Sequence, residues 1–172
     1  DVQPEKMRLL DPKVASGDIA IEWLNDPNAV GHFSPMPVMD SGGHQVKLMG
    51  ALSISLDLVD RARRGDIDNM FYLHFVLLHE SVHYEQIASE RFSSDVILNP
   101  HTTREVCVAG WNLEREAYFR ECQFAMSMGQ NSIIRAYCTT LEPKAFDYKL
   151  FLVLQENRTD NCPAFWAEDL KK

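Results

Sequence analysis

The segment from Phe71 to Glu85 constrains this chain most, because it joins a long apolar run to the motif His79-Glu80-Ser81-Val82-His83. No proline or glycine interrupts the segment, so we predict one continuous helix. Positions four apart lie on one face of a helix, about 40° apart, so His79 and His83 can bind one metal ion together. Glu80 lies about 100° around the helix from His79 and can reach a water molecule on that metal. The alternative is a buried helix with two core histidines.

Length and charge narrow the class of protein. The chain has 172 residues, which is enough for one domain with a real core. Its net charge of −8 argues against nucleic acid or an anionic membrane surface as a partner. It has no run of eighteen apolar residues, so we expect no membrane span. The N-terminus resembles no signal peptide and lacks an initiator Met, so we expect a processed protein or a domain excised from a longer one.

The residues before the motif predict one strand among irregular structure. Prolines and glycines punctuate residues 1–45, where we expect only a short helix over residues 18–25. Apolar and small residues alternate up to Leu56, which predicts a strand over residues 45–56. Asp57 then caps a helix that ends at Gly65, and Asp66 or Asp68 caps the motif helix, which extends to about Phe92.

The residues after the motif predict helices. The first begins at Thr102 or Thr103 and ends near Met128, before Gly129. A second covers about residues 131–141, and a third begins at Pro143. Residues 158–172 form a tail over the surface. We therefore predict a single α+β domain, mainly helical, over residues 1–172.

The four cysteines form no C-x-x-C pair, which argues against a cysteine zinc site. We expect most of them to be free core thiols rather than disulfides. On that expectation the cysteines do not identify a cellular compartment.

A catalytic zinc site needs a third protein ligand, because such sites use three and leave a fourth position for water. Glu114 and Glu116 are the candidates, but they lie about 200° apart on a helix, so only one can face the metal. We favour Glu114, because the small Ala117 three positions later lets two helices come close. Tyr118 then lies one turn beyond Glu114, on the same face.

The reaction also needs a hydrogen-bond donor for the developing oxyanion. We rank Tyr118 first among the candidates, which continue with Tyr148, Arg104 and His101.

H-E-x-x-H followed by Glu114-x-x-Ala117-Tyr118 resembles the gluzincin branch of zinc metallopeptidases, in which a Glu three positions before a small residue is the third ligand. The second motif is similar to that of the clostridial neurotoxin light chains, and closer to the small zincin domains of bacterial secreted effectors and polymorphic toxins. The resemblance covers about residues 50–120. The metzincin extension is absent, since Gln86 and Ser89 stand where its Gly and third His would be.

The resemblance implies a zincin-like fold, with a small sheet whose edge strand, about residues 50–56, lines the cleft beside the H-E-x-x-H helix. It also implies peptide-bond hydrolysis with Zn²⁺ held by His79, His83 and Glu114, with Glu80 as general base. A protein or peptide substrate would add to the Ser53/Ser55 strand as a further strand.

We expect a toxic module of a secreted bacterial effector, fused to a delivery protein or bound by a cognate immunity protein. One alternative is a housekeeping or peptidoglycan-directed metallopeptidase. Another is a non-catalytic helical binding domain with a structural or degenerate metal site. Glu80 argues against the last alternative, because a closed metal site has no task for it.

Overall fold

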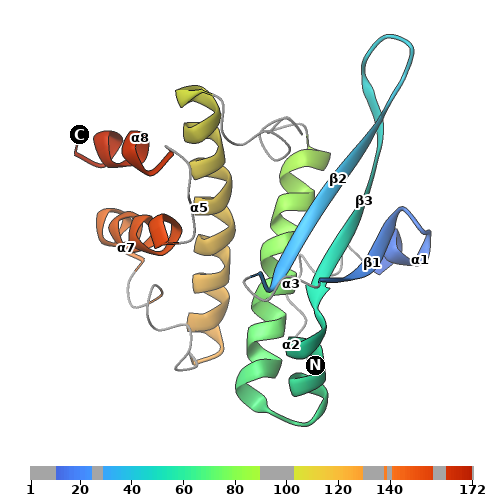
Figure 1. Cartoon of the computed structure of the whole chain (residues 1–172), viewed down its shortest axis with the longest axis horizontal. Coiled ribbons are helices and arrows are strands. Elements are labelled where there is room, and N and C mark those ends of the chain that lie inside the picture. Colours follow the sequence, from blue (N-terminus) through green and yellow to red (C-terminus); the bar gives the residue numbers. More distant parts are fainter. Residues whose placement is uncertain are drawn as a thin grey trace. The chain divides into compact units, whose positions relative to one another are not determined.

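The structure is a computed structural model that describes residues 11–24, 29–89, 103–129, 138, 141–156 and 162–171. It divides into two compact units, an N-terminal unit (Asp1–Ser94) and a C-terminal unit (Asp95–Lys172). The described residues are mostly helical, with one small sheet, which confirms the α+β class (Figure 1). The single domain stays a prediction.

The sheet of the N-terminal unit has three strands: β1 (Ile19–Leu24), β2 (Gly31–Met39) and β3 (Gln45–Ser55). Their order is β1-β3-β2, with β1 parallel and β2 antiparallel to β3. β2 and β3 form a long hairpin (Figure 1). Asp40 shapes its turn, because its Oδ1 accepts hydrogen bonds from the N–H groups of Gly42 and His44. These bonds also hold the pKa of the Asp40 carboxyl below its ordinary value, the His44 N–H having the largest effect.

The predicted strand over residues 45–56 exists, but its predicted place at the sheet edge is wrong. β3 is the central strand, with β1 on one side and β2 on the other. Its alternation is as expected, with Leu52 and Ile54 buried. One buried face requires only alternation, so the pattern did not distinguish a central strand from an edge strand.

The predicted helix over residues 18–25 is wrong, because Ile19–Leu24 is strand β1. The segment alternates Ile19, Ile21 and Trp23 with other residues, and β-branched and aromatic residues suit a strand. Its register pairs Ile19 with Gly50 of β3. Pairing with a strand distant in sequence therefore decided the conformation. The expectation that residues 1–45 are irregular fails as well, since β2 and the helix α1 (Asp11–Ala15) also lie there.

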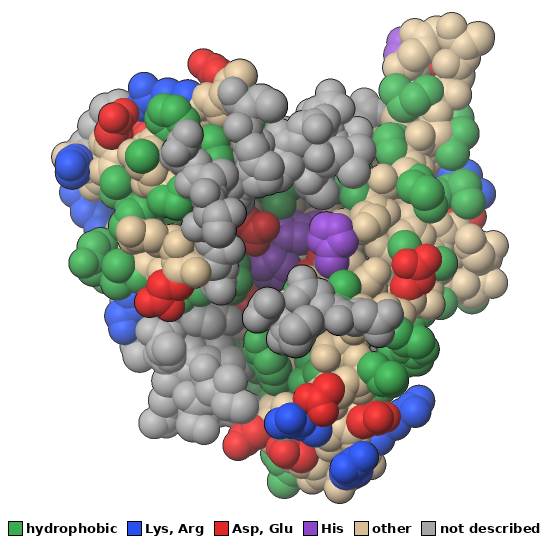
Figure 2. All heavy atoms as spheres, viewed as in Figure 1, with side chains coloured by type: hydrophobic (Ala, Val, Ile, Leu, Met, Phe, Trp, Pro, Cys, Tyr) green, Lys and Arg blue, Asp and Glu red, His purple; other side chains and the backbone are tan. Residues whose placement is uncertain are grey.

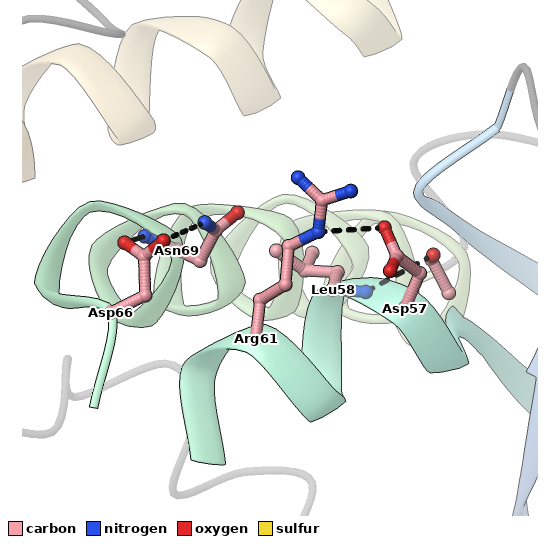
Figure 3. Close-up of polar contacts among 6 residues, drawn as sticks. Asp57, Leu58, Arg61, Asp66 and Asn69 are labelled. Carbon is pink, nitrogen blue, oxygen red and sulfur yellow. Dashed lines mark hydrogen bonds and ion pairs between the residues drawn. The ribbon is translucent and has the colours of Figure 1, made fainter. Parts of the chain in front are cut away.

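Two helices follow the sheet, and side chains cap both (Figure 3). α2 (Leu56–Arg63) begins at Ser55, whose Oγ accepts a hydrogen bond from the N–H of Leu58. Asp57, the predicted cap, instead lies in the first turn and pairs with Arg61 at 2.9 Å. α3 (Ile67–Ala88) begins at Asp66, one of the two predicted caps.

The Asp66 cap is held by two hydrogen bonds. Its Oδ1 accepts from the Asn69 backbone N–H at 3.1 Å, and its Oδ2 accepts from the Asn69 side chain at 2.7 Å. The Asn69 backbone N–H has the largest effect on the pKa of Asp66, which lies below its ordinary value of 3.8. The predicted end of the motif helix near Phe92 lies outside the described residues.

α3 packs against the sheet and α2, and its buried side chains form much of the core of the N-terminal unit. Phe75, Val82 and Ile87 are almost fully buried, and Tyr84 places its ring edge-on to Phe33 of β2, 5.9 Å between centroids. The motif therefore lies on a helix that the sheet holds firmly.

The C-terminal unit consists, in its described part, of α5 (Arg104–Ser127), α7 (Pro143–Glu156) and α8 (Cys162–Asp169). Thr103 caps α5, and Gly129 follows its end with a φ of 77°, so both predicted boundaries are confirmed. α7 begins at Pro143 as predicted. The predicted helix over residues 131–141 lies, apart from Cys138 and Leu141, outside the described residues.

The cysteine prediction is wrong, because all four form disulfides: Cys107–Cys162 and Cys122–Cys138. The predicted surface tail contains α8 instead. Its Trp166 is buried, and the indole N–H donates to the Cys107 carbonyl at 2.8 Å. Among the described residues, none of the helices has the length and apolar character needed to cross a bilayer.

Candidate metal centre

His79 and His83 lie on one face of α3, as their spacing predicts. Their Nε2 atoms are 2.8 Å apart, and the rings stand nearly perpendicular, at 88°. His83 is buried, whereas His79 is half-buried. Figure 2 shows that histidine side chains, drawn in purple, remain visible from outside. The two nitrogens thus converge on one point.

Gln86 holds the other side of the His83 ring. Its Oε1 lies 3.0 Å from His83 Nδ1, and its side chain is fully buried. Gln86 was not among the predicted site residues. The available signal was its position, three residues after a ligand and so on the same side of the helix.

Glu80 of α3 lies beside Gly31, the first residue of β2. It is 7% exposed, and a Cβ placed on Gly31 would lie 3.3 Å from Glu80 Oε1. The same Cβ would lie 2.3 Å from Cγ1 of Val76, which is closer than van der Waals contact allows. A larger residue at position 31 would therefore displace Val76 and press on the Glu80 carboxylate.

The candidate for the third ligand is the carboxylate of Glu114 on α5. Each of His79, His83 and Glu114 offers one ligand atom, and these atoms lie within 4.8 Å of one another. This group is close enough to hold a metal ion. The alternative ligand, Glu116, is outside this group and lies 3.9 Å from Arg120.

The candidate oxyanion donors differ in their surroundings. Tyr118 is half-buried on α5, one turn after Glu114. Tyr148 is 59% exposed, and Arg104 pairs with Asp169 at 2.8 Å. His101 lies outside the described residues. Tyr118 therefore stays the preferred candidate as a prediction.

The comparisons with known proteins give no relative. No protein-family model, curated protein or solved structure matches the chain. The resemblance to gluzincins therefore rests on the motif residues.

Proposed function

We propose that this protein is a zinc-dependent peptidase, with His79, His83 and Glu114 as metal ligands and Glu80 as general base. The observation that carries this proposal is the mutual approach of the three ligand atoms within 4.8 Å, next to a buried Glu80. This ligand set is one of those known for catalytic zinc.

The spacing of the histidine nitrogens is slightly shorter than in a zinc site. Two nitrogens bound tetrahedrally at ordinary zinc distances are about 3.3 Å apart. The Nε2 atoms of His79 and His83 are 2.8 Å apart, so a small rotation of the rings would admit the ion.

A bound zinc ion would supply a water molecule with a pKa near neutrality and would polarise the substrate carbonyl. Glu80 would accept the proton of the attacking water and transfer it to the leaving amine. Its burial suits this role, because a carboxylate in a dry site interacts more strongly with a proton donor. Tyr118 is proposed as the donor that stabilises the oxyanion.

The substrate is proposed to add to β2 rather than β3, because β3 has strands on both sides. The Ser55 N–H donates to the Val30 carbonyl, so Val30 and Ser55 form a hydrogen-bonded pair. In an antiparallel ladder every second residue forms such a pair, so the N–H and C=O groups of Gly31 and Phe33 point away from β3. Pro35 and Pro37 face the same way but have no N–H to donate. In the described part of the chain no strand pairs there. The Gly31–Phe33 end, beside Glu80, is thus the best place for an extended peptide.

The two disulfides support the proposal of a secreted protein, because disulfides persist in oxidising compartments. The effector role, with its delivery protein or immunity protein, rests on the resemblance alone. Expression in the cytoplasm and in the periplasm, with Glu80→Ala as the inactive control, would test it by bacterial growth.

The peptidase proposal is tested with the zinc content of the purified chain and its cleavage of a mixed library of quenched fluorescent peptides. We expect one zinc per chain, lost in His79→Ala with the far-UV circular dichroism unchanged. We expect Glu80→Gln to keep zinc but to lose cleavage by about 10²–10⁴-fold.

Two results would overturn the proposal. One is a folded wild-type protein that takes up no zinc. The other is a Glu80→Gln variant that cleaves the library as fast as wild type. Zinc without cleavage in the wild-type chain would instead support a non-catalytic metal-binding domain.

A further inference from the structure

We propose that Gln86 is the positioning residue of this metal centre: it fixes His83 in the tautomer that carries hydrogen on Nδ1 and presents the Nε2 lone pair to the metal. The inference rests on the proposed metal site. It concerns a residue that neither touches the metal nor belongs to the H-E-x-x-H motif.

The first step is the hydrogen bond. Gln86 Oε1 lies 3.0 Å from His83 Nδ1. An amide oxygen only accepts, so the nitrogen that faces it must carry the hydrogen. In a neutral imidazole the other nitrogen then has a free lone pair, and His83 Nε2 is the nitrogen that faces His79 Nε2 at 2.8 Å.

The second step is rigidity. The Gln86 side chain is fully buried on α3, one turn after His83, and His83 is 7% exposed. Burial prevents water from replacing the amide as the partner of Nδ1. A flipped amide would present its NH₂ group to Nδ1, which would require hydrogen on Nε2 and would block metal binding.

The third step is charge. Outer partners of metal-bound histidines are carboxylates, carbonyls or water. A glutamine fixes the ring without adding a negative charge, so Zn²⁺ with two neutral histidines and one carboxylate keeps a net charge of +1. Gln86 thus orients the ligand while leaving the ion's positive charge available to polarise a substrate carbonyl.

The experiment measures zinc affinity by competition with a chromophoric chelator. Gln86→Met keeps the length of the side chain but removes the acceptor, and we expect about 10–100-fold weaker zinc binding. Gln86→Glu restores an acceptor and should bind zinc within a few-fold of wild type. Ser81→Ala is the matched control, because Ser81 is equally buried on α3 and its Oγ donates to the Leu77 carbonyl at 2.6 Å. We expect this control to keep wild-type affinity.

A second readout needs no variant. Long-range ¹H–¹⁵N spectra of the zinc-free and zinc-bound wild-type protein should both show His83 with hydrogen on Nδ1. Hydrogen on Nε2 in the zinc-free protein, or equal zinc affinity in Gln86→Met and wild type, would overturn the inference. A wild-type chain that binds no zinc but holds His83 in the Nδ1–H tautomer would refute the proposed function and leave the positioning contact standing.

Discussion

The two units are stabilised in different ways. The N-terminal unit contains no cysteine and is held by a hydrogen-bonded sheet packed against α3. The C-terminal unit contains all four cysteines and, among its described residues, only helices. A short helix such as the eight-residue α8 is marginal alone, and the Cys107–Cys162 disulfide ties it to α5. The proposed site residues are also distributed unequally: His79, Glu80 and His83 belong to the N-terminal unit, and Glu114 belongs to the C-terminal unit.

The largest expected effect tests the crosslinks. Cys107–Cys162 spans 55 residues and Cys122–Cys138 spans 16, so their loss should cost about 4 and about 3 kcal/mol of unfolding free energy. We expect the Cys107→Ser/Cys162→Ser variant to lose hydrogen-exchange protection in α5, α7 and α8, while α3 keeps its protection. An equal loss of protection in α3 would show that the units do not differ in this way.

The next prediction tests what the C-terminal unit adds to the chemistry. Loss of an outer partner of a ligand weakens metal binding by up to about 100-fold. Glu114→Gln alters a direct ligand, so we expect it to weaken zinc binding by more than that. Glu116→Gln is the matched control, two residues away on the same helix, and should bind zinc like wild type. Isothermal titration with zinc distinguishes them. If Glu116→Gln gave the larger loss, the ligand assignment would be reversed.

A third prediction compares the effect on stability of replacing one glycine in each unit by alanine. Gly31→Ala would place a Cβ against Val76 and Glu80, and such overpacking costs about 1–3 kcal/mol. Gly110→Ala on α5 meets no atom within 4 Å, so it should stabilise the C-terminal unit by about 0.4–1 kcal/mol. Urea unfolding measures both, and effects of the same sign would contradict the packing at Gly31.

The smallest expected effect concerns pH and the cap of α3. The bonds from Asn69 lower the pKa of Asp66, so the cap's charge contributes stability above pH 3.8, and this contribution is lost as the pH falls through the lower folded value. Asp66→Asn keeps a capping oxygen without the charge. The gap between its urea midpoint and that of wild type should narrow on acidification. A gap that stays constant with pH would contradict this account.

Local signals predicted much of the fold. Thr103, Gly129 and Pro143 marked helix boundaries where the structure has them, because capping and glycine conformations depend on neighbouring residues. The alternation before Leu56 likewise predicted a strand. The 40° spacing of His79 and His83 was enough to place both on one face.

Features that depend on distant residues were missed. β3 is the central strand because β1 pairs with its second edge, and the sequence of β1 predicted a helix. The partners of Cys107 and Cys122 lie 55 and 16 residues away, and no local pattern indicates them. Gln86 was not predicted for a different reason. Its proposed role is to orient the His83 ring, and no sequence motif marks a residue with that role.

The nesting of the disulfides has a consequence for a protein proposed to be a protease. Cys122–Cys138 lies inside the loop that Cys107–Cys162 closes. Any single backbone cut between Cys107 and Cys162, including one made by the protein itself, leaves the fragments covalently joined. Such a nicked chain should migrate near full length on a non-reducing gel and separate into two bands only after reduction.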